Sequence, residues 1–444
     1  MAEKHYLSAA ELRKISRENM KITAAYEKKK KQKVDPKTYE TEMKDADNVL
    51  EIEDLHTFFF TDAGVVKSVN GVSFEIPQGK IVGVVGESGC GKSVTSLSVM
   101  QLVQAPQGQI VSGSIRFKTS ELSLDENNKP IPVWELDENG EPLTEEITDK
   151  HGKTVTVRVQ KTDKDGFPVF AREDKVVDIV KMPTADMRKI RGREISMIFQ
   201  EPMTSLNPVF TIGYQLDEVI LVNIPGVTRK DAKKKSIEML AQVGIAAPES
   251  VYAKYPHELS GGMRQRVMIA MAIACNPKLI IADEPTTALD VTIQAQILDL
   301  LKELKDRING SIMLITHDLG VIAGMADYVV IMYAGRIIEK GTVYDIFDDP
   351  RHPYTIGLQK SKPVVNRDTD WLYCIPGRVP NPVDLPDTCY FKDRCRNCTA
   401  ACDGPYPPLI RISDTHYVAC YRAAEMSGAK DGNEKPQKHS TSQN

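Results

Sequence analysis

The sequence predicts an α/β protein built on a parallel sheet, and three observations predict it. An apolar run at residues 81–85 has the composition of a buried parallel strand, and a glycine-rich loop follows it directly. A second apolar run, 279–282, ends in two carboxylates, and a third covers 312–315. Between the last two runs, Ile297, Leu300, Leu301 and Leu304 keep the i, i+3, i+4, i+7 spacing of a helix with one buried face.

Residues 1–48 come before this pattern and are polar, with a lysine-rich run at 28–33 and weak helical periodicity. We expect a solvated or partly helical extension, and contact of the lysines with a membrane surface is the alternative. From Val49 onward, β-type segments cover 49–52 and 68–76. A Pro-Gln-Gly turn at 77–79 then leads into the first buried strand.

An acidic, turn-rich segment, residues 118–182, interrupts the pattern. Glycine turns recur at 137–140, 149–152 and 163–166, and residues 154–159 alternate as a half-buried strand does. The segment therefore predicts an inserted β-meander. Helical and β/α patterns then resume to about residue 342, and a Pro- and Cys-rich region follows Phe347. We expect residues 426–444, which are polar, to form a disordered tail.

Length and composition restrict the class of protein. The 444 residues allow one large domain with additions, or two or three ordinary domains. The net charge of −4 gives no reason to expect nucleic acid as a partner, because polyanion binders are usually basic. No run reaches the roughly 18 apolar residues that span a bilayer, and the N-terminus lacks an apolar signal core. We expect a cytoplasmic protein that would serve a membrane only through separate membrane-spanning subunits.

The loop after the first buried strand fits the pattern G-x-x-x-x-G-K-[ST]. Its residues are Gly86, Glu87, Ser88, Gly89, Cys90, Gly91, Lys92 and Ser93. In such a loop backbone N–H groups turn inward around phosphates, the lysine neutralises the β/γ charge and the serine hydroxyl binds Mg²⁺. Because the loop lies between a strand and a probable helix, we expect a nucleotide site and not a plain glycine turn. Cys90 holds an x position where any small residue fits, and we assign it no redox role.

Asp283 and Glu284 end the second apolar run, which delivers acidic groups to the carboxyl edge of the sheet, beside the phosphates. We expect Asp283 to hold Mg²⁺ and Glu284 to polarise the attacking water. Adjacent acids at a strand end are ordinarily only solvated, but after a phosphate loop the catalytic interpretation is favoured.

Ser260, Gly261 and Gly262 lie between these two motifs, within residues 259–266. Ser260 suits the N-cap of a helix that continues through Ile273. Glycines at a helix N-terminus can bind an anion, although the segment by itself would be only a capped helix.

The order of these parts resembles that of one family, the nucleotide-binding subunits of ABC transporters. Residues 86–93 look like the Walker A loop, and 279–284 look like Walker B. Residues 259–266 look like the signature motif, with Met263 in place of the commoner glutamine. Gln200 is similar to the Q-loop glutamine, Asp290 to the D-loop aspartate and His317 to the switch histidine.

The resemblance implies a P-loop NTPase of the ABC type, with a RecA-like core, an antiparallel β subdomain and a helical subdomain at 200–270. Its nucleotide-binding domain would cover 49–345. In this family ATP is bound between two subunits, so Ser260, Gly261 and Gly262 would act on nucleotide held by a partner. Gln200 would sense Mg²⁺ and the docked membrane subunit, and His317 would contact the γ-phosphate. Phe60, within 58–60, would stack on adenine.

Three stretches, 263–272, 283–296 and 352–355, are similar to the D-type ATPase of oligopeptide and dipeptide permeases. This similarity implies an ATP-hydrolysing subunit that powers peptide import at the cytoplasmic face of the cell membrane. Its partners would be a companion F-type ATPase, two membrane-spanning permease subunits and, indirectly, an extracellular peptide-binding protein. An importer of nickel or another small solute is the alternative. The resemblance covers 49–117 and 183–422 and gives no function to the extension or the insertion.

Six of the eight cysteines fall in the last sixth of the sequence, and in a reducing compartment such a cluster suggests a metal before disulfides. In a C-terminal domain at 346–425, one set looks like the family's ligands for a [4Fe–4S] cluster, namely Cys389, Cys395, Cys402 and Cys420. Four thiolates also suit Zn²⁺. Thr388 stands where the family usually has Gly, Cys398 is an additional thiol, and four reduced cysteines are the alternative.

Two other functions share the nucleotide machinery. A soluble ABC ATPase acting on DNA or ribosomes predicts a basic surface, a coiled-coil insert or a second nucleotide domain, and the sequence has none of these. A scaffold that binds ATP without hydrolysing it would be expected to lose Glu284, His317 or Ser260, and all three are present.

Overall fold

The computed structural model describes residues 8–30, 32, 34–127, 129–148, 154–163, 166–287, 289–361 and 373–423. Its central sheet consists of β3 (Ile81–Val85), β8 (Ile195–Ile198), β9 (Leu279–Asp283), β10 (Ser311–Thr316), β11 (Tyr328–Tyr333), β12 (Arg336–Thr342), β13 (Ile410–Arg411) and β14 (Tyr417–Val418). Within the described residues the strand order is β13-β14-β12-β11-β3-β10-β9-β8. Strands β11, β3, β10, β9 and β8 run parallel to one another, which confirms the predicted α/β class.

Every residue of β3, β9 and β10 is buried, because both faces of the sheet are covered. Ile81 and Val85 belong to one hydrophobic core, whereas Val82 and Val84 belong to the other. This division follows from the two-residue period of a strand. On the first face lie α9 (Val291–Ile308) and α10 (Leu319–Met325), and the predicted stripe of α9 is buried there: Ile297, Leu300, Leu301 and Leu304.

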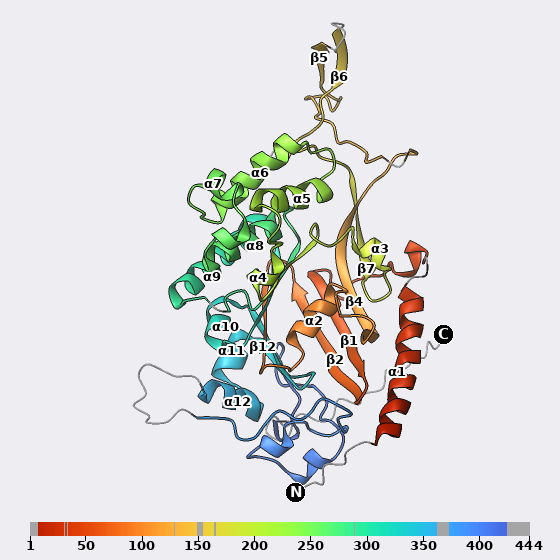
Figure 1. Cartoon of the computed structure of the whole chain (residues 1–444), viewed down its shortest axis with the longest axis vertical. Coiled ribbons are helices and arrows are strands. Elements are labelled where there is room, and N and C mark those ends of the chain that lie inside the picture. Colours follow the sequence, from red (N-terminus) through yellow and green to blue (C-terminus); the bar gives the residue numbers. More distant parts are fainter. Residues whose placement is uncertain are drawn as a thin grey trace, which may run out of the picture.

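A second, antiparallel sheet covers the other face in the order β2-β1-β4-β7. Its strands are β1 (Asn48–Thr61), β2 (Gly64–Pro77), β4 (Gly108–Leu122) and β7 (Arg172–Asp178). Helix α1 (Ala9–Lys30) lies along this sheet (Figure 1). Asn19 donates a hydrogen bond to the carbonyl of Thr61 at 2.7 Å, and the ring of Tyr26 stacks on Phe60. In its described part the N-terminal extension thus contains a helix that contacts this sheet through a few residues, while most of its side chains are exposed.

The part of the insertion between β4 and β7 projects away from the body as an arm, whereas its two ends belong to the antiparallel sheet (Figure 1). In its described part, segments from different turns are joined by closed sets of backbone hydrogen bonds. Ser123 donates to Ala171, Ala171 donates to Ile131, and Ile131 donates back to Ser123, at 2.8–3.0 Å. Further along the arm the same cycle joins residues 133, 169 and 161, and then residues 135, 159 and 143. Because each set closes on itself, these levels of the arm leave fewer unpaired backbone groups than an open sheet edge.

At the tip of the arm, β5 (Thr144–Thr148) pairs with β6 (Thr154–Arg158). The predicted strand at 154–159 is thus present. Its half-buried character was wrong, since β5 is exposed throughout and β6 is almost entirely exposed. Alternation in sequence marks two faces of a strand, but a buried face also needs a core behind it, and the tip has none. The expected turn at 149–152 lies outside the described residues.

Helices α4 (Pro202–Ser205), α5 (Ile212–Asn223), α6 (Arg229–Gln242), α7 (Pro248–Tyr252) and α8 (Gly261–Ile273) fill the interval where a helical subdomain is expected. The amino ends of α5, α6 and α8 are capped by Thr211, Thr228 and Ser260, whose hydroxyls accept backbone N–H groups. Two further helices lie elsewhere in the chain, α2 (Lys92–Val99) after the phosphate loop and α3 (Thr184–Met187) after β7.

The C-terminal region continues the central sheet and does not form a sheet of its own. After α11 (Val343–Asp348) and α12 (Pro353–Lys360), its strand β14 pairs with β12. It also contacts β2, where the N–H of Lys67 donates to the carbonyl of Pro382. A separate Cys-rich domain is therefore not confirmed. The tail at 426–444 lies outside the described residues, and among those described no helix is long and apolar enough to cross a membrane.

Candidate nucleotide site

The glycine loop joins β3 to α2 and is fixed by close backbone contacts. Gly91 has a φ of 103°, and a Cβ there would lie 2.2 Å from the carbonyl oxygen of Ser68. A Cβ on Gly86 would lie 2.3 Å from the carbonyl oxygen of Met332. Only glycine fits either position without moving the backbone. The requirement for glycine therefore comes from the packing of the loop as well as from its conformation.

Lys92 is buried in the loop, with 5 % of its surface exposed. Its Nζ donates to the carbonyl oxygens of Gly86 at 2.7 Å and Glu87 at 3.1 Å. The ammonium is thus held over the loop by neutral oxygens, and it can exchange these partners for the oxygens of a phosphate. Cys90 is buried beside it, and burial raises the pKa of this thiol, which supports the assignment of no redox role.

Ser93 and Asp283 are brought together across the sheet edge. The Ser93 hydroxyl donates to the Asp283 carboxylate at 3.0 Å, from α2 to the end of β9. Asp283 is 5 % exposed, and burial, reinforced by the charge of Glu284, raises its pKa, although Ser93 and Lys92 oppose the shift. A hydroxyl beside a carboxylate at the end of a strand is the donor set that Mg²⁺ uses in phosphate-loop proteins. These residues therefore fit the metal ion expected here.

Glu284 is the centre of a second group of polar side chains. Its carboxylate accepts from Gln200 Nε2 at 3.1 Å and from Thr287 Oγ1 at 2.8 Å, and it lies 3.3 Å from His317 Nδ1. Its backbone is in the left-handed region, with φ at 47°. Gln200, Glu284 and His317 come from three separate segments, and the fold brings them together; the roles that the resemblance implies for them stay predictions. Thr287 was missed, and its only signal was its place three residues after the carboxylate.

Ser260 and Asp290 have contacts within their own helices. Ser260 Oγ accepts from the N–H of Met263 at 3.3 Å, and Asp290 Oδ1 accepts from the N–H of Ile293 at 3.0 Å. Ser260 and Gly261 are exposed, and Gly262 is partly exposed. An exposed N-terminus on α8 leaves the signature segment open to a second molecule. Phe60 is 9 % exposed, and its ring is stacked against Tyr26, so its assignment to adenine stays a prediction.

The four predicted cysteine ligands line the same small cavity, which also includes His352. They are Cys389, Cys395, Cys402 and Cys420. Burial raises the pKa of Cys389 to about 11 and also raises that of Cys395 and Cys420. Among the described residues, however, no group of three or more His, Cys, Asp or Glu side chains is placed to hold a metal ion. The extra thiols of Cys374 and Cys398 are exposed.

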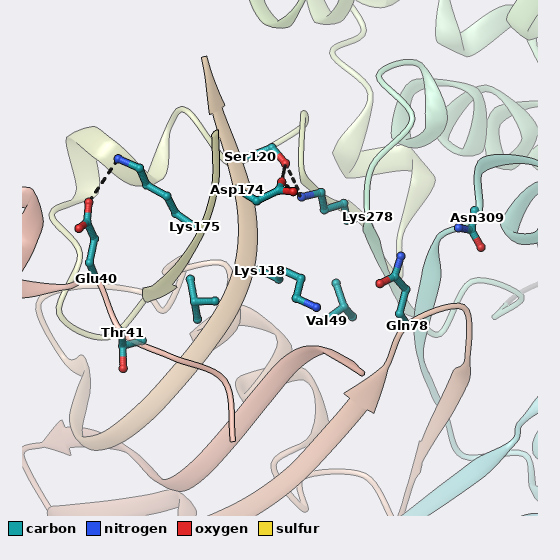
Figure 2. Close-up of a pocket in the computed structure, with 11 residues that line it drawn as sticks. Glu40, Thr41, Val49, Gln78, Lys118, Ser120, Asp174, Lys175, Lys278 and Asn309 are labelled. Carbon is teal, nitrogen blue, oxygen red and sulfur yellow. Dashed lines mark hydrogen bonds and ion pairs between the residues drawn. The ribbon is translucent and has the colours of Figure 1, made fainter. Parts of the chain in front are cut away.

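A larger polar cavity of about 690 Å³ lies away from the phosphate loop (Figure 2). It is lined by Gln78, Lys278 and Asn309, which lie one to three residues before β3, β9 and β10 and so mark the amino ends of these strands. Its ammonium groups have partners, as Lys278 donates to Ser120 at 2.6 Å and Lys175 lies 3.4 Å from Glu40. The phosphate loop is at the opposite edge of the sheet, so this cavity is not the nucleotide site.

The sequence matches two families, the ABC transporter family over residues 69–287 and the oligopeptide/dipeptide transporter C-terminal region over residues 338–402. It is 43% identical over 373 residues to the oligopeptide transport ATP-binding protein AppD of Bacillus subtilis (strain 168), covering 84% of this chain and 96% of that protein. The chain belongs to the ATP-binding subunits of oligopeptide/dipeptide ABC transporters.

A second relative of this ABC family, the dipeptide transport ATP-binding protein DppD of the same organism, is 42% identical over 375 residues, or 84% of this chain and 95% of that protein. The solved dimeric ATP-binding cassette MJ0796 bound to ADP and Pi has a TM-score of 0.48 and 20% identity, over 66% of this chain and 98% of that one. Membership of the family establishes an ABC-type P-loop fold with an antiparallel β subdomain, and it establishes ATP hydrolysis coupled to transport as the activity.

Proposed function

We propose that this chain hydrolyses ATP to power import of oligopeptides or dipeptides, at the cytoplasmic face of a membrane. The observation that carries the proposal is the arrangement around Glu284. Its carboxylate is held by Gln200, Thr287 and His317, next to the Ser93–Asp283 pair at the same edge of the sheet. Asp283 thus contacts Ser93, the other expected metal ligand. Glu284 is surrounded by groups that can position water.

Each residue of the site has a role in this proposal. Lys92 exchanges the carbonyls of Gly86 and Glu87 for the β/γ-phosphates. Ser93 and Asp283 hold Mg²⁺, which neutralises charge on the phosphates when bound. Glu284 accepts a proton from the attacking water, and His317, which is exposed beside it, supports this role by contacting the γ-phosphate.

The site is half of a composite one. Ser260, Gly261 and Gly262 form an accessible helix N-terminus, which binds anions through unpaired N–H groups. They would bind nucleotide held by a second ATPase subunit, and in return this chain's phosphate loop would face that subunit's signature segment. We propose the companion F-type ATPase as this partner and two membrane-spanning permease subunits as the docking site of the pair.

Transport in a reconstituted system tests the proposal. The chain would be co-purified with the permease and ATPase subunits of its gene neighbourhood, placed in liposomes with the peptide-binding protein, and supplied with labelled peptides. ATP-dependent peptide uptake is expected. Uptake of nickel and not of peptides would favour the small-solute importer, and no ATP hydrolysis in any combination would contradict the assignment.

The cysteine cavity is a second proposed site. We propose that Cys389, Cys395, Cys402 and Cys420 hold a [4Fe–4S] cluster, with Zn²⁺ as the competing occupant. The four cysteines are spread over 32 positions of the chain and still line the same cavity, which supports a shared ligand. Anaerobic purification is expected to give a brown protein containing iron and sulfide. A colourless protein with one equivalent of zinc would identify the other occupant, and a metal-free protein would reject both.

A further inference from the structure

Glu87, the first variable residue of the phosphate loop, is bound by a residue of the C-terminal region. Its carboxylate accepts two parallel hydrogen bonds from the guanidinium of Arg394, at 2.9 and 3.1 Å. The two residues are 307 positions apart in the chain. An x position of such a loop is ordinarily free to be solvated, so a bidentate pair from a distant segment needs a reason.

Arg394 is held in place before it reaches the loop. Only 7 % of its side chain is exposed, its Nε donates to the carbonyl of Pro376 at 2.9 Å, and its guanidinium lies 3.3 Å from the Tyr333 hydroxyl. The rings of Tyr333 and Phe391 flank it, with centroids 5.7 and 5.8 Å away. With its rotamers fixed by packing, the guanidinium is a rigid anchor for the carboxylate.

The backbone of Glu87 is tied as well. Its N–H donates to the hydroxyl of Tyr354 at 2.9 Å, and its carbonyl accepts from Lys92 at 3.1 Å. Tyr354 is fully buried in α12, also in the C-terminal region. The two C-terminal side chains therefore fix both the side chain and the backbone of the residue whose carbonyl holds the catalytic lysine.

We propose that Arg394 and Tyr354 are positioning residues for ATP hydrolysis, which clamp Glu87 and so set the phosphate loop in its binding geometry. The proposal rests on the proposed function and deepens it, because it makes the C-terminal region part of the nucleotide site of its own chain. Neither residue touches the nucleotide. Each acts through Glu87, on the carbonyl from which Lys92 moves to the phosphates.

A double-mutant cycle tests the clamp in the full-length chain. Arg394→Gln and Glu87→Gln are each expected to weaken binding of a fluorescent ATP analogue with Mg²⁺, and to raise KM for ATP, by roughly tenfold. The double variant is expected to be no worse than the more severe single variant, because both remove the same contact. Tyr354→Phe, which keeps the ring packing, is expected to have a smaller effect of about two- to fivefold.

Matched variants separate the clamp from a purely structural role. Arg396→Gln removes the same charge two residues away, where the side chain packs over the Tyr373 ring and is exposed, and is expected to leave KM unchanged. Arg394→Lys keeps the charge without the bidentate geometry and is expected to recover only part of the affinity. If Arg394→Gln does not fold, Glu87→Gln measures the same contact from the loop, where the carboxylate is 27 % exposed.

Additive effects in the cycle, or an unchanged KM in a folded Arg394→Gln protein, would overturn the clamp. Both outcomes require a wild-type protein that binds and hydrolyses ATP. A wild-type protein that does neither would instead contradict the proposed function, so the two failures are distinguishable.

Discussion

The buried side chain of His352 is expected to make the free energy of unfolding fall in acid. Replacing this residue is expected to remove that pH dependence. The side chain is 2 % exposed and caps α12, where its Nδ1 accepts the N–H of Tyr354 at 3.0 Å. Burial lowers its pKa from the ordinary 6.5 to about 4, and the neighbouring Glu339 only partly opposes this shift. The folded protein therefore keeps the ring neutral at pH values where the unfolded chain binds a proton.

The sign and size of the effect follow from the two pKa values. Between them the unfolded state carries more protons, so stability falls as the pH drops from about 6.5 toward about 4, and the penalty is absent above this window. At 1.36 kcal/mol per pKa unit the full penalty is about 3 kcal/mol. About 2 kcal/mol of it develops between roughly pH 7.5 and pH 5.

His352→Asn tests this because an asparagine side chain can accept the same N–H but does not titrate. Loss of ring packing on Phe391 will lower the stability of the variant at every pH, so the comparison is between slopes and not absolute values. Urea unfolding of wild type and variant across this range is expected to show a shallower acid slope in the variant. His257→Asn, at an exposed position, is the control with an unchanged slope. Parallel curves for wild type and His352→Asn would show that His352 does not cause the acid sensitivity.

Three further changes have defined outcomes. Thr287→Val removes the hydroxyl that donates to Glu284 at 2.8 Å and is expected to lower kcat by roughly ten- to a hundredfold, with little change in KM. Thr287→Ser keeps the hydroxyl and is expected to keep the activity, so equal rates for the two variants would contradict the role of Thr287. Gly91→Ala places a Cβ 2.2 Å from the carbonyl oxygen of Ser68, at a backbone φ of 103°. It is expected to weaken nucleotide binding more than tenfold in a fluorescence titration, and wild-type affinity would show that the loop adapts. Replacing residues 137–158 by a short Gly-Ser linker is expected to leave ATPase activity unchanged and shift Tm by less than about 2 °C, because β5 has no buried residue; a large fall in Tm would assign the arm a structural role.

The sequence was sufficient to predict those features of the fold and site that depend on neighbouring residues in the chain. The phosphate loop, the two carboxylates at the end of β9 and the buried face of α9 each depend on a short pattern, and the structure has them in the predicted elements. Gln200 and His317 needed the family resemblance, because a single glutamine or histidine has no pattern of its own. The resemblance placed them in order along the chain, and the fold brings both to Glu284.

The features that the sequence did not predict depend on long-range packing. Helix α1 contacts the sheet through Asn19 and Tyr26. Its sequence has no apolar stripe from which this contact could be predicted. The closed hydrogen-bond cycles of the arm join segments up to 48 positions apart in one level, and local turn signals say nothing about such pairing. Arg394 lies next to the predicted ligand Cys395, and no local pattern around it indicates a partner in the phosphate loop. Only the fold reveals that it reaches the phosphate loop.

Glu284 is proposed to activate water for ATP hydrolysis, while other residues bind the nucleotide. Single-turnover hydrolysis and equilibrium ATP binding, measured together on the assembled transporter with wild-type chain and with Glu284→Gln, test it most directly. The rate in the variant is expected to be lowered by about 10²–10⁴-fold, with ATP affinity within about threefold of wild type, because the amide cannot accept the proton and the phosphate loop is unchanged. Hydrolysis at the wild-type rate in Glu284→Gln would contradict it.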